Sequence, residues 1–411
     1  MLPYLVSMIM IILCSVLLFK YCFSRKKPLI FGIYQQRNAT FLFKFVTMYV
    51  ILKIRKLKVY LKRLLAAESG SGKDGVIHVQ EHDACLEKLY DLGGNEKAVD
   101  GVYFNGMSKS GDAVICGIAR RPQRHCDAFL YLKISGEDIF LTPSLPDTYL
   151  KKCSDDHEGH SVQGLSATNF MPMRTWKLLY NGEMNSKSQP DLIFKVEANI
   201  TWSAIWAPFE YDTQMSARSV ANDMARETWS AEYFQLLKKF HQTHYEQMGY
   251  LKGTVSVDTK KLYEINMPCI RDRSFGPLRE WRNFHRYVYH FIFLNNDDFI
   301  AVGTVSQPCV LSHLTIGYYC RKIDQSVKAI DSSDFQLYQH GENGNPPKDY
   351  GFIFSIGHQS YAVKVQAYDE VSFFIGKERE AKFYERWSNI EVNDIKGRAC
   401  VEWHYNNVVP K

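Results

Sequence analysis

The chain has 411 residues, which is enough for two or three domains and a large buried core. Hydrophobic residues make up 46% of the chain and charged residues 23%, so a disordered or collagen-like protein is excluded. The net charge of +6 is unevenly divided, because the first 67 residues carry 12 Lys or Arg and no acid. The remainder holds 38 basic and 44 acidic residues, a distribution that argues against nucleic-acid binding.

Residues 1–24 predict a transmembrane anchor. The stretch 3–23 is almost wholly apolar and reaches the ~20 residues that cross a hydrocarbon core. A cleaved signal peptide is the alternative, but no basic residue precedes the apolar stretch and no small-residue cleavage site follows it. Three basic residues, 25–27, follow directly, so the positive-inside rule places the body in the cytoplasm. The sequence thus predicts a single-pass membrane protein.

Residues 25–75 predict a basic juxtamembrane segment followed by a linker. The apolar run 41–54 is interrupted by a lysine and is too short for a second crossing. Apolar residues then recur at helical spacing over 54–65, with basic residues from Lys53 to Arg63 between them. This pattern is typical of an amphipathic helix on anionic lipid, and a helix packed on the protein body is the alternative. Small and polar residues at 66–74 predict a flexible linker.

Residues 76–215 predict a first β domain. Apolar residues alternate with polar ones in short runs, as at 101–104 and 113–118, with turn residues between the runs. The segment 216–249 breaks this pattern with helical spacing and predicts a helical connector. Alternating strands return over 250–411 and predict a second β domain. Many short strands without crossover helices favour barrels or sandwiches over a parallel α/β sheet.

The sequence carries no motif that predicts a metal or a cofactor. Ten cysteines are scattered without a C-x-x-C, which suits reduced cytoplasmic thiols better than a disulfide framework. His241, His244 and Glu246 would lie close together on the predicted helical connector, but no H-E-x-x-H motif accompanies them. We therefore expect neither a metal ligand set nor a cofactor site.

The densest group of charged and aromatic residues lies between Cys269 and Arg286. On an extended strand, Arg271 and Arg273 would share one face and Asp272 would lie on the other. If buried, these side chains would form a charge-assisted network that either shapes a polar pocket or stiffens a domain junction.

The same segment resembles a known family. Arg271 to Pro277, together with Trp281, is similar to the R-D-[RH]-S-[WF]-G-x-R-x-W signature of proteins related to hydroxyneurosporene synthase, a carotenoid hydratase. Leu278 and Arg279 depart from it by shifting the second arginine of the signature by one place.

The resemblance extends over residues 102–405, with further similar motifs in the same order, such as YFNG at 103–106 and PFEY at 208–211. It is nearest to the N-terminal regions of arthropod and nematode phosphoenolpyruvate synthase-like proteins. The resemblance implies two tandem lipocalin-like barrels, and it marks a fold more specifically than an activity.

The PFEY motif belongs to an aromatic-rich segment that could line a cavity or the junction between the barrels. Glu210 lies in it, close to Trp206 and Tyr211. An ionised Glu210 would need a partner, for which an arginine of the 271–273 group is the candidate. If Glu210 were instead desolvated and unpaired, its pKa would rise and it could act as a general acid.

We therefore expect a mainly β protein with two tandem lipocalin-like (calycin) barrels, a helical connector and an N-terminal transmembrane helix. Its expected function is binding of a lipophilic small molecule at the membrane. One alternative is a cofactor-independent hydratase, cyclase or isomerase of an isoprenoid-like substrate with Glu210 or Asp272 as the acid. Another is a non-catalytic scaffold related to phosphoenolpyruvate synthase-like phosphotransferases. The candidate ligand-binding residues are Trp206, Glu210, Tyr211, Arg271, Asp272, Arg273, Ser274 and Trp281.

Overall fold

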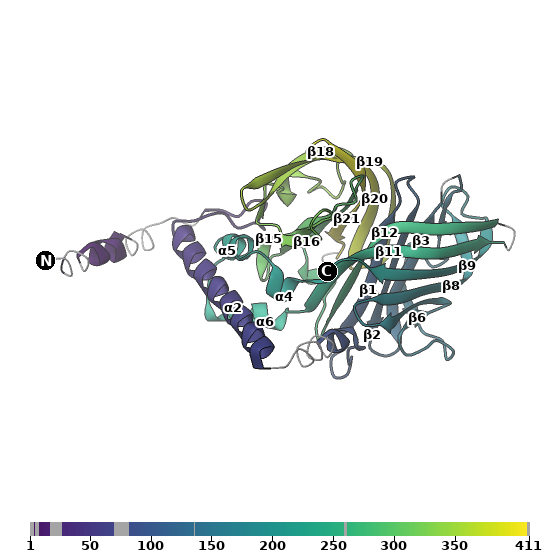
Figure 1. Ribbon diagram of the computed structural model, residues 1–411, viewed down its shortest axis with the longest axis horizontal. Helices are drawn as coiled ribbons and strands as arrows, with labels where there is room; N and C mark the ends of the chain where they lie inside the picture. Colours follow the sequence, from purple (N-terminus) through teal and green to yellow (C-terminus); the bar gives the residue numbers. More distant parts are fainter. Residues whose placement is uncertain are drawn as a thin grey trace.

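Antiparallel β-strands form most of the protein in a computed structural model, arranged as two curved sheets that lie side by side (Figure 1). The structure describes residue 4 and residues 8–16, 27–69, 82–134, 136–258 and 261–408. The predicted strands at 101–104 and 113–118 are present and extend further in both cases. The YFNG motif lies inside the first strand, not in a turn.

Eight strands close the first barrel in the order β11, β12, β1, β2, β3, β4, β8 and β9, and β9 pairs back with β11. Their bounds are β1 (Val99–Met107), β2 (Ala113–Arg121), β3 (His125–Lys133), β4 (Ile139–Leu141), β8 (Thr175–Ser186), β9 (Ile193–Ala204), β11 (Thr243–Val257) and β12 (Lys261–Gly276). Four short strands extend this sheet: β5 (Tyr149–Lys151), β6 (His160–Val162), β7 (Leu165–Met171) and β10 (Phe209–Glu210).

Nine strands form the second sheet, a half-barrel with the order β16, β15, β14, β13, β21, β20, β19, β18 and β17. Their bounds are β13 (Arg286–Leu294), β14 (Phe299–Gln307), β15 (Leu311–Arg321), β16 (Ser326–Ala329), β17 (Ser332–Ser333), β18 (Asp349–Ile356), β19 (Gln359–Ile375), β20 (Ala381–Val392) and β21 (Ile395–Asn406).

Helices lie beside the sheets. Their bounds are α2 (Phe41–Ser69), α4 (Tyr211–Gln214), α5 (Ala217–Met224) and α6 (Ala231–Lys239), with short 3-10 helices η1 (Trp281–Asn283) and η2 (Leu337–Gln339). In Figure 1, α2 runs along one side of the molecule, and it packs against α5. Ser216 caps α5 and Ser230 caps α6 with their side-chain oxygens, so each helix begins where its sequence supplies an acceptor.

The helical connector is shorter than the sequence predicts. Helical structure ends near Lys239, and β11 starts at Thr243. Residues 245–249 are all buried, because both faces of β11 are covered in this part of the strand. The sequence here therefore lacks the alternation of apolar and polar residues that predicts a strand. Strands β11 and β12 pair with β9 and β1, so much of the segment 250–276 completes the first barrel instead of beginning a second domain.

Three hydrophobic clusters hold the sheets together. One is confined to the first barrel and includes Trp176 and Trp202, and another joins the second sheet to Tyr34 and Phe335. The third cluster takes side chains from both sheets, among them Phe129 of β3 and Phe383 of β20. The inter-barrel space is therefore a third apolar core, and aromatic residues dominate it.

No helix among the described residues is both long enough and apolar enough to cross a membrane. Of the predicted anchor, residues 4 and 8–16 are helical, and the rest lies outside the described residues. The run 41–54 and the basic residues that follow it belong to one continuous helix, α2. Within the predicted linker, residues 70–75 also lie outside the described residues.

Candidate functional site

A cavity of about 370 Å³ lies between the first barrel and the second sheet. Strands β1, β2, β3, β11 and β12 supply one wall, and β13, β14, β15, β19, β20 and β21 supply the other. Its size is that of a small-molecule site. The lining is rich in aromatic side chains, including Tyr103, Phe129, Tyr211, Trp281, Tyr287 and Phe383.

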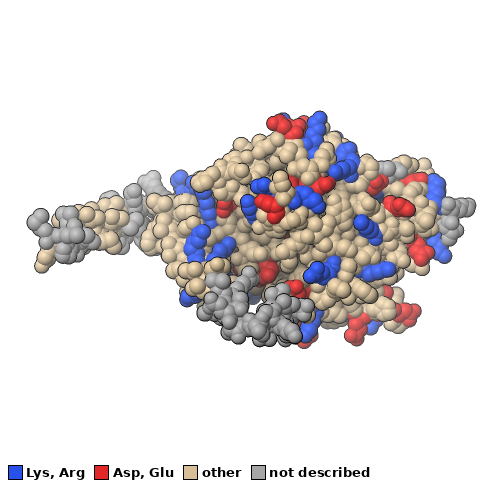
Figure 2. Space-filling view, viewed as in Figure 1, with Lys and Arg blue, Asp and Glu red and all other residues tan. Residues whose placement is uncertain are grey.

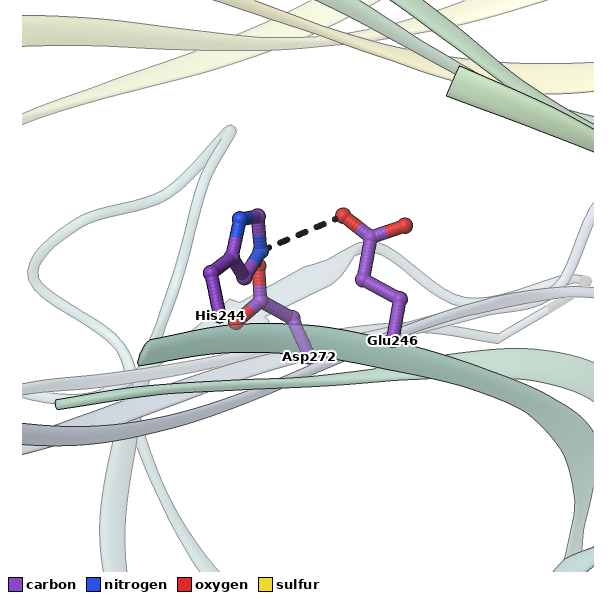
Figure 3. A group of neighbouring side chains, drawn as sticks. All are labelled: His244, Glu246 and Asp272. Carbon is purple, nitrogen blue, oxygen red and sulfur yellow. Dashed lines mark hydrogen bonds and ion pairs between the residues drawn. The ribbon is translucent and has the colours of Figure 1, made fainter. Parts of the chain in front are cut away.

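A polar cluster of His244, Glu246 and Asp272 lies at the wall that the first barrel supplies (Figure 3). His244 and Glu246 are two residues apart on β11, and Glu246 is the register partner of Asp272 on β12, so all three project to one side. The His244 Nε2 atom lies 2.8 Å from Asp272 Oδ2 and 3.4 Å from Glu246 Oε1. One imidazole therefore bridges two carboxylates.

The charge state of this cluster follows from its surroundings. Burial would lower the pKa of His244, but the two carboxylates beside it raise that pKa to about 10. Burial raises the pKa of Glu246, and the ion-pair contact with His244 opposes that rise. At neutral pH, His244 is accordingly an imidazolium held between acids.

Tyrosines complete the surroundings of His244. The Tyr211 ring stacks on the His244 ring with a centroid separation of 4.3 Å. The Tyr211 and Tyr289 hydroxyls are hydrogen-bonded to each other, and Tyr289 donates to Glu246 Oε2 over 3.0 Å. This network fixes the imidazole ring in one orientation.

The same three residues could also hold a metal ion, since each offers one ligand atom and these atoms lie within 4.8 Å of one another. The 2.8 Å separation of His244 Nε2 and Asp272 Oδ2 is, however, an ordinary hydrogen-bond length. We interpret the cluster as an ion pair.

A second polar cluster is centred on Glu385 and Glu402, which are register partners on β20 and β21. The two carboxyl groups share a side-chain hydrogen bond. Tyr103 donates to Glu385 Oε1 over 2.8 Å, and Tyr287 donates to Glu402 Oε1 over 2.6 Å. The Cys400 thiol lies 3.3 Å from Glu385 Oε2. In the described part of the chain, the partners of the two carboxyls, apart from each other, are hydroxyls and a thiol, not cations.

This environment keeps a proton on the pair. Burial raises the pKa of Glu385 to about 7. Burial and the neighbouring Glu385 charge raise the pKa of Glu402 well above its ordinary range, and the Asp272 carboxylate adds to that rise. A hydrogen bond between two carboxyls also requires that one of them is protonated. The Glu385–Glu402 pair is thus a buried acid near neutral pH.

The two clusters meet at the cavity. Glu402 and Asp272 both line it, and Tyr103, the donor to Glu385, is the register partner of Asp272. Arg279 also lines the cavity and donates from Nε to Gln242 Oε1 over 2.7 Å. Burial lowers the pKa of Arg279 to about 10, so the guanidinium remains charged at neutral pH. The site combines an acid, a carboxylate base and a cation within an aromatic lining.

Among the candidates from the sequence, Tyr211, Asp272, Ser274 and Trp281 line this cavity. Arg271 and Arg273 point the other way, into the first barrel, as the alternation of β12 predicts. Trp206 is buried in the inter-barrel cluster, where its ring meets Phe299 at a centroid separation of 4.9 Å.

The two arginines form a structural network of their own. Arg271 lies 2.8 Å from Glu87, donates to Gln247 over 2.9 Å, and has its guanidinium 4.8 Å from the Trp202 ring centre. Arg273 is paired with Asp100. Burial would raise the pKa of Asp100, but hydrogen bonds and charges from His160 and Arg273 hold it well below its usual range.

The expected pairing of Glu210 with these arginines is wrong, because Arg271 and Arg273 have acidic partners inside the barrel. Glu210 lies on β10, where its carboxylate accepts from the Thr213 hydroxyl over 3.3 Å and lies 3.5 Å from His82 Nε2. Glu210 is not among the described side chains that line the cavity.

The sequence does not predict where four acid–base residues of these clusters lie: His244, Glu246, Glu385 and Glu402. The first two lie in the segment that the sequence predicts to be helical, whereas the structure places them on one face of strand β11. Glu402 alternates with Val401 and Trp403, which suggests a solvent-facing polar side. Its burial depends on the packing of the other barrel, which no local pattern shows.

These features define a class of protein in which two curved antiparallel β-sheets enclose a polar site in an aromatic cavity. Residues 5–405 match the sequence model of a family of unknown function (DUF8627), and the chain belongs to this family. No curated protein matches the chain.

Several solved structures are similar in fold. A protein of Nitrosomonas europaea described as AttH has a TM-score of 0.51 and 9% identity, covering 77% of this chain and 97% of its own. CghA has a TM-score of 0.46 and 8% identity, covering 77% of this chain and 90% of its own. Kievitone hydratase from Nectria haematococca has a TM-score of 0.42 and 12% identity, covering 78% of this chain and 91% of its own. The first likeness is consistent with a tandem arrangement of lipocalin-like barrels, here one closed barrel and one half-barrel. The relation to phosphoenolpyruvate synthase-like proteins stays a prediction.

Proposed function

We propose that this protein binds a lipophilic small molecule between its barrels and converts it by proton transfer, as a cofactor-independent hydratase, cyclase or isomerase. The observation that carries the proposal is the proton-holding Glu385–Glu402 pair, which shares the cavity with the Asp272 carboxylate. Burial and the neighbouring Glu385 charge raise the pKa of Glu402 well above its ordinary range, so Glu402, which lines the cavity, would hold a proton that it can donate as a general acid.

The chemistry balances with the groups present. Glu402 gives its proton to one carbon of a double bond, so its O–H bond breaks and a C–H bond forms. The adjacent carbon becomes cationic, and a water oxygen adds to it in a hydration. Asp272 takes the proton that this water releases. In an isomerisation, Asp272 takes a proton from carbon instead, and in both cases the proton returns to Glu402 through solvent.

The lining suits such a reaction. Aromatic ring faces attract cations, so Trp281, Tyr287 and Phe383 would stabilise a positive charge that forms on carbon. Arg279 would bind an oxygen function of the ligand. The proposed substrate is therefore an unsaturated, isoprenoid-like molecule with one polar group.

The test uses the purified full-length protein and a lipophilic extract of the cells that make it. Mass spectrometry of the extract, incubated with the protein in ¹⁸O-labelled or deuterated water, should show one compound that gains the solvent isotope. Asp272→Asn should bind that compound without labelling it. If the wild-type protein binds a compound without labelling it, the protein is a carrier of that compound and not an enzyme. A carrier is the second candidate function, and the largely apolar lining of the cavity favours it.

A further inference from the structure

Helix α2 is held on the protein body by its lysines. The Lys44 ammonium is buried and donates to the Glu227 carbonyl oxygen over 2.5 Å. Twelve residues further along the helix, the Lys56 ammonium donates to the Met215 carbonyl oxygen, also over 2.5 Å. Lys44, Met48 and Leu52 follow helical spacing on this inner face. The orientation of α2 about its own axis is therefore fixed.

The opposite face of α2 is apolar and uncovered in the described part of the chain. Its residues recur every three or four positions and are each between 46% and 57% exposed. We call them the outer stripe: Phe43, Val46, Val50, Ile54, Leu57 and Leu61. Exposed apolar rows of this length are uncommon on soluble surfaces and mark interaction sites.

Basic residues border the outer stripe. At 100° per residue, Lys53 falls on one edge of the stripe and Lys58 on the other, and both are exposed. Figure 2 shows Lys and Arg side chains gathered over α2. No acidic residue precedes Glu68, so residues 41–67 of α2 include basic residues and no acidic ones.

We infer that α2 lies flat on an anionic bilayer surface, with the outer stripe in the acyl boundary and the lysines at the level of the phosphates. Lysine beside an apolar stripe is the arrangement of interfacial helices, because the long side chain reaches the headgroups. A second copy of α2 would bring like charges together, which favours an anionic lipid surface as the occupant.

The docking also gives the cavity a position relative to the bilayer. Met215, which accepts the Lys56 hydrogen bond, lines the cavity, as does Tyr211 of α4. This short segment therefore contacts α2 on one side and lines the cavity on the other. A lipophilic molecule would therefore reach the site from the membrane side, although the docking itself does not depend on the proposed function.

The experiment places a photo-crosslinking amino acid in the full-length protein, at Val50 in the outer stripe or at Leu52 on the inner face. The protein is mixed with phosphatidylserine-containing or pure phosphatidylcholine vesicles and irradiated. Lipid adducts at position 50, absent at position 52, are expected with phosphatidylserine, and raised salt should reduce them. Because the readout is local, contacts made elsewhere in the chain cannot produce it.

Charge reversal provides the matched comparison. Lys53→Glu with Lys58→Glu should lower the adduct at position 50 about tenfold or more, because each lysine near an anionic surface contributes about 1 kcal/mol. Lys195→Glu with Lys252→Glu changes two exposed lysines on β9 and β11 and should leave the adduct unchanged. Equal lipid adducts at positions 50 and 52, or a protein–protein adduct at position 50 in place of lipid, would overturn the inference.

Discussion

Glu385 and Glu402 are direct partners across β20 and β21, and their carboxyl groups are hydrogen-bonded to each other. Two buried carboxyls in contact cannot both ionise at ordinary pH, since like charges repel and burial penalises each charge. The pair therefore stores one proton beside a cavity whose other wall presents Asp272.

This pair should make stability depend on pH in the acidic range. The pKa of Glu385 rises from its ordinary 4.5 to about 7 on folding, so the folded state binds more protons between these values. The contribution of the protonated Glu385 to stability is complete below about pH 4.5 and falls as pH rises to about 7. Urea unfolding of Glu402→Gln should show a smaller fall, whereas Glu264→Gln, at an exposed site on β12, should match the wild type. Equal slopes in all three proteins would refute the shared proton.

The contribution of His244 to stability should depend on pH over a higher range. Its pKa rises from 6.5 to about 10 on folding, so its contribution is complete below pH 6.5 and is lost as pH approaches 10. Asp272→Asn removes the nearer carboxylate, so the fall in stability between pH 6.5 and 10 should be smaller in this variant. NMR titration of the His244 ring should find it charged at pH 8 in the wild type. A neutral ring at that pH would contradict the ion-pair interpretation.

The acids inside the first barrel should matter more for folding than Asp272. Glu87→Ala or Asp100→Ala would strand a buried arginine, at a cost of ~3–5 kcal/mol in the free energy of unfolding. Asp272→Ala leaves both arginine pairs intact and should cost much less. Chemical denaturation of the three variants measures this difference. An Asp272→Ala loss as large as the other two would restore Asp272 to the arginine network.

Glu210 should be dispensable for turnover. Its carboxylate contacts Thr213 and His82, away from the described cavity lining. Glu210→Gln should therefore keep wild-type conversion of the cavity ligand in a mass-spectrometric assay. A loss of conversion with unchanged ligand binding would return Glu210 to the list of catalytic acids.

Local sequence patterns predict much of the fold but only part of the site. Strand alternation predicts that Arg271 and Asp272 face opposite sides of β12. The resemblance through Trp281 implies two tandem barrels, and the structure contains one closed barrel and a second half-barrel. Glu385 and Glu402 join the site only because β20 and β21 pair and then pack against another barrel. His244 was hidden for a related reason, since β11 is buried on both faces and looks unlike a surface strand.

The cavity itself can be closed by one substitution. Val305 on β14 lines the cavity and is half-buried, so Val305→Trp should fill the space and prevent ligand binding without disturbing either acid cluster. Binding of the extracted ligand, followed by mass spectrometry of the folded variant, measures this effect. Retained binding would place the ligand elsewhere.

The most direct test of the account compares ligand binding and ligand conversion in wild type and Glu402→Gln in the same extract. The glutamine keeps the size of the side chain and its hydrogen bonds but cannot release a carboxyl proton. We expect Glu402→Gln to bind the same compound as the wild type and to leave it chemically unchanged. Conversion by Glu402→Gln at the wild-type rate would contradict the claim that the Glu385–Glu402 pair supplies the proton.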